Sequence, residues 1–212
     1  MNKMIPQKRT CRTPMIITLA LLISLFSCSE KDSLDKSFSD LTDNLIKENF
    51  EEAVKYVPPQ IIEETGRENW IKNMKKSGNA FFTIKISDAQ IDKKGNILTS
   101  GDTSCCVFVC LQTIRFEFSD DLPDSNKSAF FNNKKESPNV QSIKWIEENK
   151  IIESVSVQLY LAVSYNSGDN WYFLKSPNSE TVDLLLNDRK KSDLLLEEAK
   201  KLSEQFNSTT YN

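Results

Sequence analysis

The sequence predicts an α+β domain in which N-terminal helices pack on an antiparallel sheet, followed by a C-terminal helix. Apolar residues recur at helical spacing in the first half of the chain, from Leu34 to Met74. At Phe81 the period changes from 3.6 to 2, which is typical of strands. From about Thr181 to Phe206 the helical spacing returns. These changes of period place the helices before and after a β-rich centre.

Proline and glycine divide the first helical half. Pro58-Pro59 stops the first amphipathic pattern, Gly66 ends a short turn, and Gly78 is the expected C-cap of the next helix. The predicted helical segments are residues 34–57 with a bend near Asn49, 60–65 and 67–77.

The β-rich centre contains several alternating segments. The predicted strands are residues 82–87, 96–99, 104–118, 155–164 and 171–174, of which the last two form a hairpin. Residues 119–149 are rich in Asp, Asn, Lys and Ser and contain two prolines. We expect them to form a long, solvent-facing polar insertion with a small apolar patch at Phe130-Phe131.

The segment 104–118 carries the strongest strand pattern, and one of its faces is almost wholly apolar. Gln112 is the only polar member of that face between Cys106 and Phe118. The candidate ligand-facing residues on this face are Phe108, Gln112, Ile114 and Phe116. In the hairpin we expect Ser156, Gln158 and Tyr160 on the opposite, convex surface.

Histidine is absent from the chain. This excludes Ser-His-Asp and Cys-His nucleophiles and zinc sites that depend on imidazole. Cys105, Cys106 and Cys110 lie in a strand pattern that holds them too far apart for a disulfide or one zinc ion, so we interpret them as core thiols. If the segment were helical, Cys106 and Cys110 would be neighbours and a thiolate site would be conceivable. We expect no metal and no cofactor.

Residues 1–28 have the order of a secretory signal: a basic start, a short apolar run, and a cysteine at the end. Leu25-Phe26-Ser27-Cys28 resembles the lipobox of bacterial lipoproteins, in which the cysteine receives a lipid and becomes the N-terminus after cleavage. The resemblance implies a membrane anchor at Cys28, and Ser29 resembles an outer-membrane sorting residue. We therefore expect a lipid-anchored protein of the bacterial cell envelope, in the outer membrane.

Loss of residues 1–27 removes four Lys/Arg and no acid, which leaves 23 basic against 30 acidic residues and a net charge of about −7. Such a surface repels phosphate backbones, so we expect no nucleic-acid partner. The predicted organisation is a signal peptide (1–27), a tether (28–36), a cone-like domain (37–175, with the insertion 119–149) and a C-terminal helical extension (176–212).

The order of helices, hairpin, long strand and second hairpin resembles the superfamily of nuclear transport factor 2 and ketosteroid isomerase. The resemblance covers about residues 38–175 and includes the phrases Asn49–Tyr56 and Asp169–Phe173. It implies a curved, cone-shaped antiparallel sheet with a pocket inside the cone, into which the ligand-facing residues would point, and a convex surface through which many members pair, so a homodimer is one expectation. Some members use an Asp in the pocket, but we interpret Asp88 and Asp92 as ordinary turn acids.

The hairpin tip, residues 164–171, resembles the aspartate box of sialidases, with Asn166 in place of the Asp. A single box in a chain of this length implies a tight turn and not a sialidase.

These observations leave two possible functions, from different classes. The first is a non-catalytic envelope lipoprotein that binds a small ligand, a glycan or a partner protein. The alternative is a His-free acid/base enzyme acting in the cone pocket.

Overall fold

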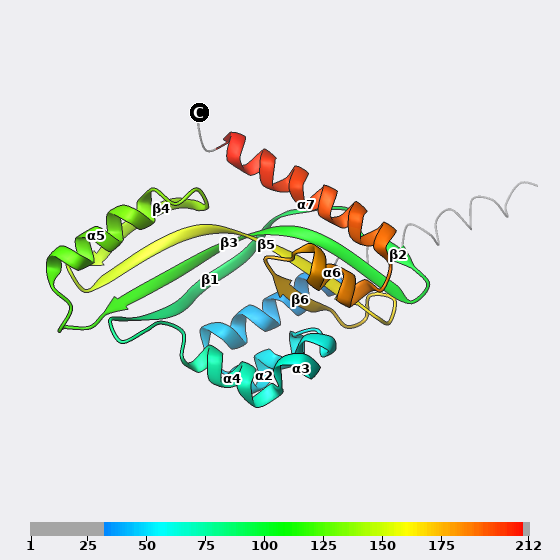
Figure 1. The fold of residues 1–212 in the computed structure, drawn as a ribbon, viewed down its shortest axis with the longest axis horizontal. Helices are drawn as coiled ribbons and strands as arrows, with labels where there is room; N and C mark the ends of the chain where they lie inside the picture. The colour runs from blue at the N-terminus through cyan, green and yellow to red at the C-terminus, as the bar shows by residue number, and fades with distance from the viewer. Residues whose placement is uncertain (1–31, 210–212) are drawn as a thin grey trace, which may run out of the picture.

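The structure, a computed structural model, describes residues 32–209 and has the predicted α+β class. Helices precede and follow one six-stranded antiparallel sheet that is not closed (Figure 1). The helical segments are an unlabelled helix over residues 32–46, α2 (Phe50–Ala53), η1 (Val54–Tyr56), α3 (Pro59–Thr65), α4 (Arg67–Lys75), α5 (Asp124–Lys135), α6 (Ser179–Leu186) and α7 (Arg189–Thr209). The strands are β1 (Phe82–Lys94), β2 (Leu98–Ser100), β3 (Thr103–Phe118), β4 (Val140–Glu147), β5 (Ile151–Ser164) and β6 (Tyr172–Lys175).

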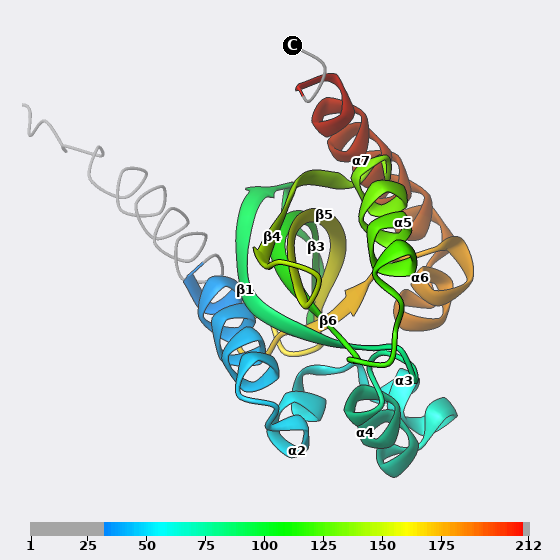
Figure 2. The same ribbon diagram turned by 90° about the vertical axis from the view of Figure 1, so that its left-hand side faces the viewer.

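The sheet is built around the long pair β3 and β5. Its order is β1-β3-β5-β4, with β2 beside one end of β3 and β6 beside one end of β5. β3 and β5 stay in one unbroken register from Ser104 opposite Ser164 to Glu117 opposite Ile151. β1 and β4 each contain two register shifts, which increase local twist. Figure 2 shows the resulting strong curl of the strands.

The face of β3 that carries Phe108, Gln112 and Phe116 is called the inner face here. At the β6 end of the sheet the 32–46 helix covers this face, because its apolar stripe packs there. The core beneath this helix consists of Leu34, Phe38, Leu41, Ala53, Cys106, Phe108, Cys110, Tyr160, Ala162, Trp171 and Phe173. Leu34 is fully buried. Residues 32–36, which we expected in the tether, are therefore part of the domain.

A second core covers the outer face at the same end of the sheet. Alternation places the other side chains of β3 and β5 there, and α6 and α7 pack on them. Its buried members are Cys105, Val107, Val109, Leu161, Val163, Val182, Leu185, Leu195, Ala199 and Leu202. The C-terminal extension thus forms part of the fold, since it covers the apolar outer face at this end of the sheet.

The expectation of a solvent-facing loop over residues 119–149 is wrong, because this segment contains α5 and β4. Phe130 of α5 packs on Phe82, Phe116 and Phe118 of the inner face, and Phe131 stacks on Trp145 of β4. A polar composition concealed the helix, since α5 rests on the sheet through few apolar side chains. The twist of the sheet places α5 and the N-terminal helices on different sides in Figure 1.

Two predicted helices are broken in the structure. The chain over residues 34–57 has its expected change of direction near Asn49, where Glu48 has a φ of 55° and a turn separates the 32–46 helix from α2. The predicted single helix over 181–206 is α6 and α7, because Asn187 takes a left-handed conformation that ends α6. Gly78 is not a C-cap: Lys76 caps α4, and Gly78 forms a β-bridge with Thr83.

The predicted position of Ser156, Gln158 and Tyr160 on the convex outer surface is wrong. Tyr160 lies opposite Phe108, and Ser156 lies opposite Gln112, in the antiparallel register of β3 and β5. Directly opposed residues share a face, so all three side chains belong to the inner face. The apolar alternates of β5 face outward because α6 and α7 supply the apolar cover there.

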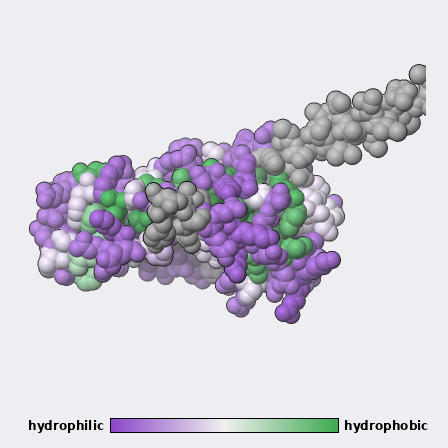
Figure 3. Space-filling view, turned by 90° about the horizontal axis from the view of Figure 1, so that it is seen from above, coloured by the Kyte–Doolittle hydropathy of each residue, from purple (hydrophilic) through white to green (hydrophobic). Residues whose placement is uncertain are grey.

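The surface is mainly hydrophilic. Figure 3, seen from the side that carries α7, shows polar residues over most of the molecule with separate apolar areas. The large exposed apolar side chains in the described part are Ile46, Phe81, Ile146, Leu184 and Leu194. Within residues 32–209, none of the helices has both the length and the apolar character that a membrane span requires.

Candidate ligand-binding cavity

A cavity of about 300 Å³ lies on the inner face, between the core beneath the 32–46 helix and the core beneath α5. Phe108 and Phe116 of β3 belong to these two cores, and the residues midway between them are left to line the cavity. Its apolar lining comes from the N-terminal helical segments, α4, β1 and β3: Leu45, Ile46, Phe50, Met74, Ile84, Ile86 and Ile114. This volume is at the lower end of the range for small-molecule sites.

Gln112 and Lys175 form the polar base of the cavity. Gln112 is only 2% exposed, and its Oε1 accepts a hydrogen bond of 3.1 Å from Lys175 Nζ. Gln112 also hydrogen-bonds Tyr160, whose pKa is raised because the phenol is buried. Although part of Lys175 is exposed, its side chain reaches into this covered region, and desolvation lowers the pKa of its ammonium group. A neutral amide thus holds a cation at the base of an apolar cavity.

The open side of the cavity is also charged. Lys75 and Lys85 line it together with one carboxylate, that of the exposed Glu48. Lys85 forms an ion pair of 2.9 Å with Glu117, and this hydrogen-bonded pair raises the pKa of Lys85. The lining therefore carries more positive than negative charge, in a chain whose formal net charge is −3.

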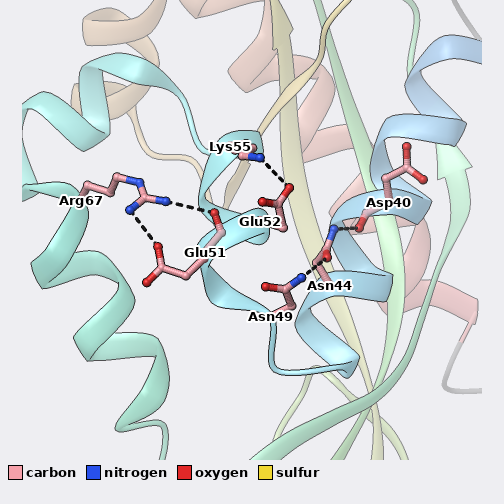
Figure 4. A network of polar contacts seen from close by, with 7 residues as sticks. All are labelled: Asp40, Asn44, Asn49, Glu51, Glu52, Lys55 and Arg67. Carbon is pink, nitrogen blue, oxygen red and sulfur yellow. Dashed lines mark hydrogen bonds and ion pairs between the residues drawn. The ribbon is translucent and has the colours of Figure 1, made fainter.

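Polar contacts hold the helical wall of the cavity together (Figure 4). Arg67 at the start of α4 contacts Glu51 of α2 through an ion pair of 2.8 Å and a hydrogen bond of 3.1 Å to its carbonyl oxygen. Asn49 Nδ2 donates to Asn44 Oδ1 at 3.2 Å, across the turn that follows the 32–46 helix. These contacts fix three helical segments relative to one another, although each is exposed and contributes little to stability.

The structure separates the four predicted ligand-facing residues. Gln112 and Ile114 line the cavity. Phe108 and Phe116 share their face but are packed inside the two flanking cores, and neither lines the cavity. Helices cover both phenylalanines. The alternation pattern of the strand could not predict where these helices pack.

Cys28 lies outside the described residues. Cys105, Cys106 and Cys110 are buried and free of disulfides, which confirms their interpretation as core thiols. Burial raises the pKa of Cys105 to about 11 and that of Cys110 to about 12. Among residues 32–209, no three Cys, Asp or Glu side chains are grouped in a way that could hold a metal ion.

The two acids weighed for catalysis do not reach the cavity. Asp88 and Asp92 are exposed on β1, each at one of its register shifts, and neither belongs to the lining. Among the described residues, Glu48 is the only carboxylate in the lining, and it lies at the exposed side. The arrangement therefore offers no pair of carboxylates for acid and base work.

The turn that resembles an aspartate box is a structural element. Asn166 Oδ1 accepts hydrogen bonds from Ser164 Oγ at 2.8 Å and from the Asn170 N–H at 3.0 Å. Gly168 has a φ of 89°, and its N–H donates to Ser164 Oγ at 3.0 Å. Trp171 is 1% exposed in the core beneath the 32–46 helix. These contacts close the β5–β6 hairpin and so position Lys175.

The chain matches no protein-family model, and none of the curated proteins is similar to it at a significant level. The class that the fold and the cavity define is an α+β domain with a small, partly apolar cavity between its N-terminal helices and the inner face of its sheet.

Sequence reasoning missed several residues of the cavity. Lys175 directly follows the predicted strand 171–174, and nothing in the sequence indicated that it contacts Gln112, which is 63 positions earlier. Met74 and Leu45 were expected as ordinary members of apolar helical stripes. One signal was available: a glutamine within an apolar strand face requires a polar partner once it is buried.

Proposed function

We propose that the protein is a non-catalytic lipoprotein of the bacterial cell envelope, anchored in the outer membrane through Cys28, whose domain binds a small ligand in the inner-face cavity. The observation that carries the ligand-binding part is the cavity itself. It combines an apolar lining with one partly buried polar contact, between Gln112 and Lys175. Small-molecule sites are typically apolar, with a few polar groups that fix orientation.

The envelope part of the proposal rests on residues 1–28. The order of basic residues, apolar run and Leu25-Phe26-Ser27-Cys28 is that of a lipoprotein signal. Two or three acyl chains hold a protein at a membrane essentially permanently, whereas one chain binds only reversibly. No basic surface patch is then needed for attachment.

The choice of binding over catalysis rests on the ionisable groups of the cavity. The chain contains no histidine, and the lining contains one exposed carboxylate, Glu48, with three lysines. General acid and base catalysis requires groups within hydrogen-bond reach of the reacting atoms, with suitable pKa values. A cavity with a single rim carboxylate favours a binding function.

A cavity-filling variant tests the binding function. Ile86 lines the cavity but belongs to none of the three core clusters, so Ile86→Trp should fill the space at a modest cost in stability. Gln90→Trp is the matched control, since Gln90 is exposed on the same strand and lies opposite Leu111 of the outer face. Compounds that bind the cavity should raise the melting temperature of the wild type and Gln90→Trp, but not of Ile86→Trp. Equal shifts in all three proteins would contradict the assignment of the site.

A second experiment tests the anchor. Cells that express the wild type or Cys28→Ser are labelled with a radioactive fatty acid and fractionated. We expect label in the wild-type protein and its recovery in outer-membrane fractions, and neither for Cys28→Ser. Recovery of Cys28→Ser in the membrane with wild-type gel mobility would contradict the lipoprotein proposal.

A further inference from the structure

Three lysines around the cavity have no carboxylate partner within ion-pair distance among the described residues. Lys75 and Lys175 belong to the lining, and Lys134 lies at the end of α5. The other lysine of the lining, Lys85, is paired with Glu117. Some lysines elsewhere in this acidic protein also have acid partners, for example Lys94 with Asp35 at 2.7 Å. The positive charge of Lys75, Lys134 and Lys175 beside the cavity is thus not neutralised by an ion pair among the described residues.

Lys175 is the cation at the base of this cavity. Its Nζ is held at 3.1 Å from Gln112 Oε1, and Gln112 is in turn held by Tyr160. A neutral amide orients an ammonium group but leaves its full charge uncompensated. An ammonium group has three donors, and this contact uses one of them. The other two remain for a ligand.

Lys134 adds a second positive charge nearby. Its Nζ lies 5.6 Å from the centre of the Phe116 ring, at the edge of the core beneath α5. It is close enough that its charge contributes to the lowered pKa of Lys175. Two like charges in a partly desolvated region repel each other, and an anion placed beside them relieves that repulsion.

The rest of the lining determines the chemistry of the other end of the ligand. It consists mainly of apolar side chains, among them Ile86 and Ile114 from the sheet and Met74 from α4. At about 30 Å³ for each water-sized group, a cavity of this volume admits roughly ten non-hydrogen atoms. We infer that the ligand is a small amphipathic monoanion, such as a medium-chain carboxylate, whose anionic group binds Lys175 and whose apolar body lies against Ile86 and Ile114. This inference rests on the proposed binding function of the cavity.

Matched probes of equal chain length test the inference. Octanoate, 1-octanol and octylammonium have about the same size and differ in head-group charge. Each is labelled with ¹³C at the first carbon and titrated by NMR into the full chain in lipid nanodiscs, with empty nanodiscs as the blank. We expect octanoate to bind roughly tenfold more tightly than 1-octanol, and octylammonium to bind more weakly than 1-octanol.

Two variants test whether Lys175 causes the preference for octanoate over 1-octanol. Lys175→Met should abolish the preference for octanoate while 1-octanol still binds, and this binding shows that the variant is folded. Lys72→Met is the matched control, because Lys72 is exposed on α4 and lies outside the cavity lining. This variant should keep the roughly tenfold preference. Persistence of the full preference in Lys175→Met would overturn the role of that lysine.

The wild-type titration separates two kinds of failure. Equal binding of octanoate and 1-octanol, abolished in Ile86→Trp, would overturn the anionic ligand class while the binding function of the cavity stands. Absence of binding by all three probes would overturn the inference together with the apolar cavity site on which it rests. Both results are read from the wild-type chain and do not depend on the folding of Lys175→Met.

Discussion

The rings of Phe108 and Tyr160 stack across the β3–β5 pair, with centroids 5.5 Å apart and 10° between their planes. The two residues face each other in the register, and Phe38 of the 32–46 helix meets both rings edge-on at 4.9 and 5.4 Å. This triad joins the first described helix to the two central strands. It also determines which side chains of β5 belong to the inner face.

A first prediction concerns Tyr160. Tyr160→Ala should lower the free energy of unfolding by about 3 to 5 kcal/mol, as expected for a buried aromatic residue, because it leaves a cavity among Phe38, Phe108 and Phe173. Tyr160→Phe keeps the ring and should cost only about 1 to 2 kcal/mol, since it loses the contact with Gln112. Equilibrium unfolding of a chain that begins at residue 29 measures both. A cost below about 1 kcal/mol for Tyr160→Ala would place the side chain outside the core.

A second prediction concerns the close approach at Gly78. Gly78 has a φ of 114°, and an added Cβ would lie 2.3 Å from the Phe82 carbonyl oxygen, a backbone atom that cannot move independently. Gly78→Ala should therefore cost about 2 to 4 kcal/mol. Gly101→Ala is the control, because Gly101 also has a positive φ, 59°, but an added Cβ meets nothing within 4 Å. It should cost about 1 kcal/mol. Thermal unfolding of the two variants compares these costs, and equal losses would contradict the clash.

The third prediction concerns the thiols. Burial raises the pKa of Cys105 and Cys110 to about 11 and about 12, so both stay protonated at pH 8, and the thiolate is the reactive form. A chain that begins at residue 29 should show three thiols in denaturant and alkylate far more slowly when folded. Mass spectrometry of alkylated protein follows both states. A single thiol in denaturant would reveal a disulfide and contradict the strand assignment of residues 103–118.

A fourth prediction concerns the outer face near β4. Glu153 pairs with Lys144 at 3.1 Å and Arg115 at 3.0 Å, and these partners lower the pKa of its carboxyl group. A carboxyl group whose pKa is lower when folded stabilises the protein above its unfolded pKa, about 4.3, and loses this contribution as the pH falls through the folded value. Glu153→Gln should thus cost about 1 kcal/mol at pH 7. Urea unfolding across pH should show the difference disappear in acid, and a constant difference down to pH 2 would contradict the ion pairs.

The local patterns of the chain were sufficient to predict most of the helices and strands. The apolar spacing before Pro58, the change of period at Phe81 and the alternation in residues 104–118 and 155–164 all correspond to observed helices and strands. Leu195, Ala199 and Leu202 form the expected apolar stripe of the last helix. The α5 helix was missed because its pattern is weak: its place depends on Phe130 meeting Phe82 and Phe116, which are distant in sequence.

By itself, the sequence determined the α+β class, the alternating faces of β3 and the burial of three cysteines, because these depend on periodicity and residue type along one segment. Only the tertiary structure decided that Tyr160 faces inward, that α6 and α7 cover the outer face, and that Lys175 meets Gln112. Alternation divides a strand into two faces, but whatever packs against each face decides which one is inner. That choice depends on register and on contacts between distant segments, which no local pattern contains.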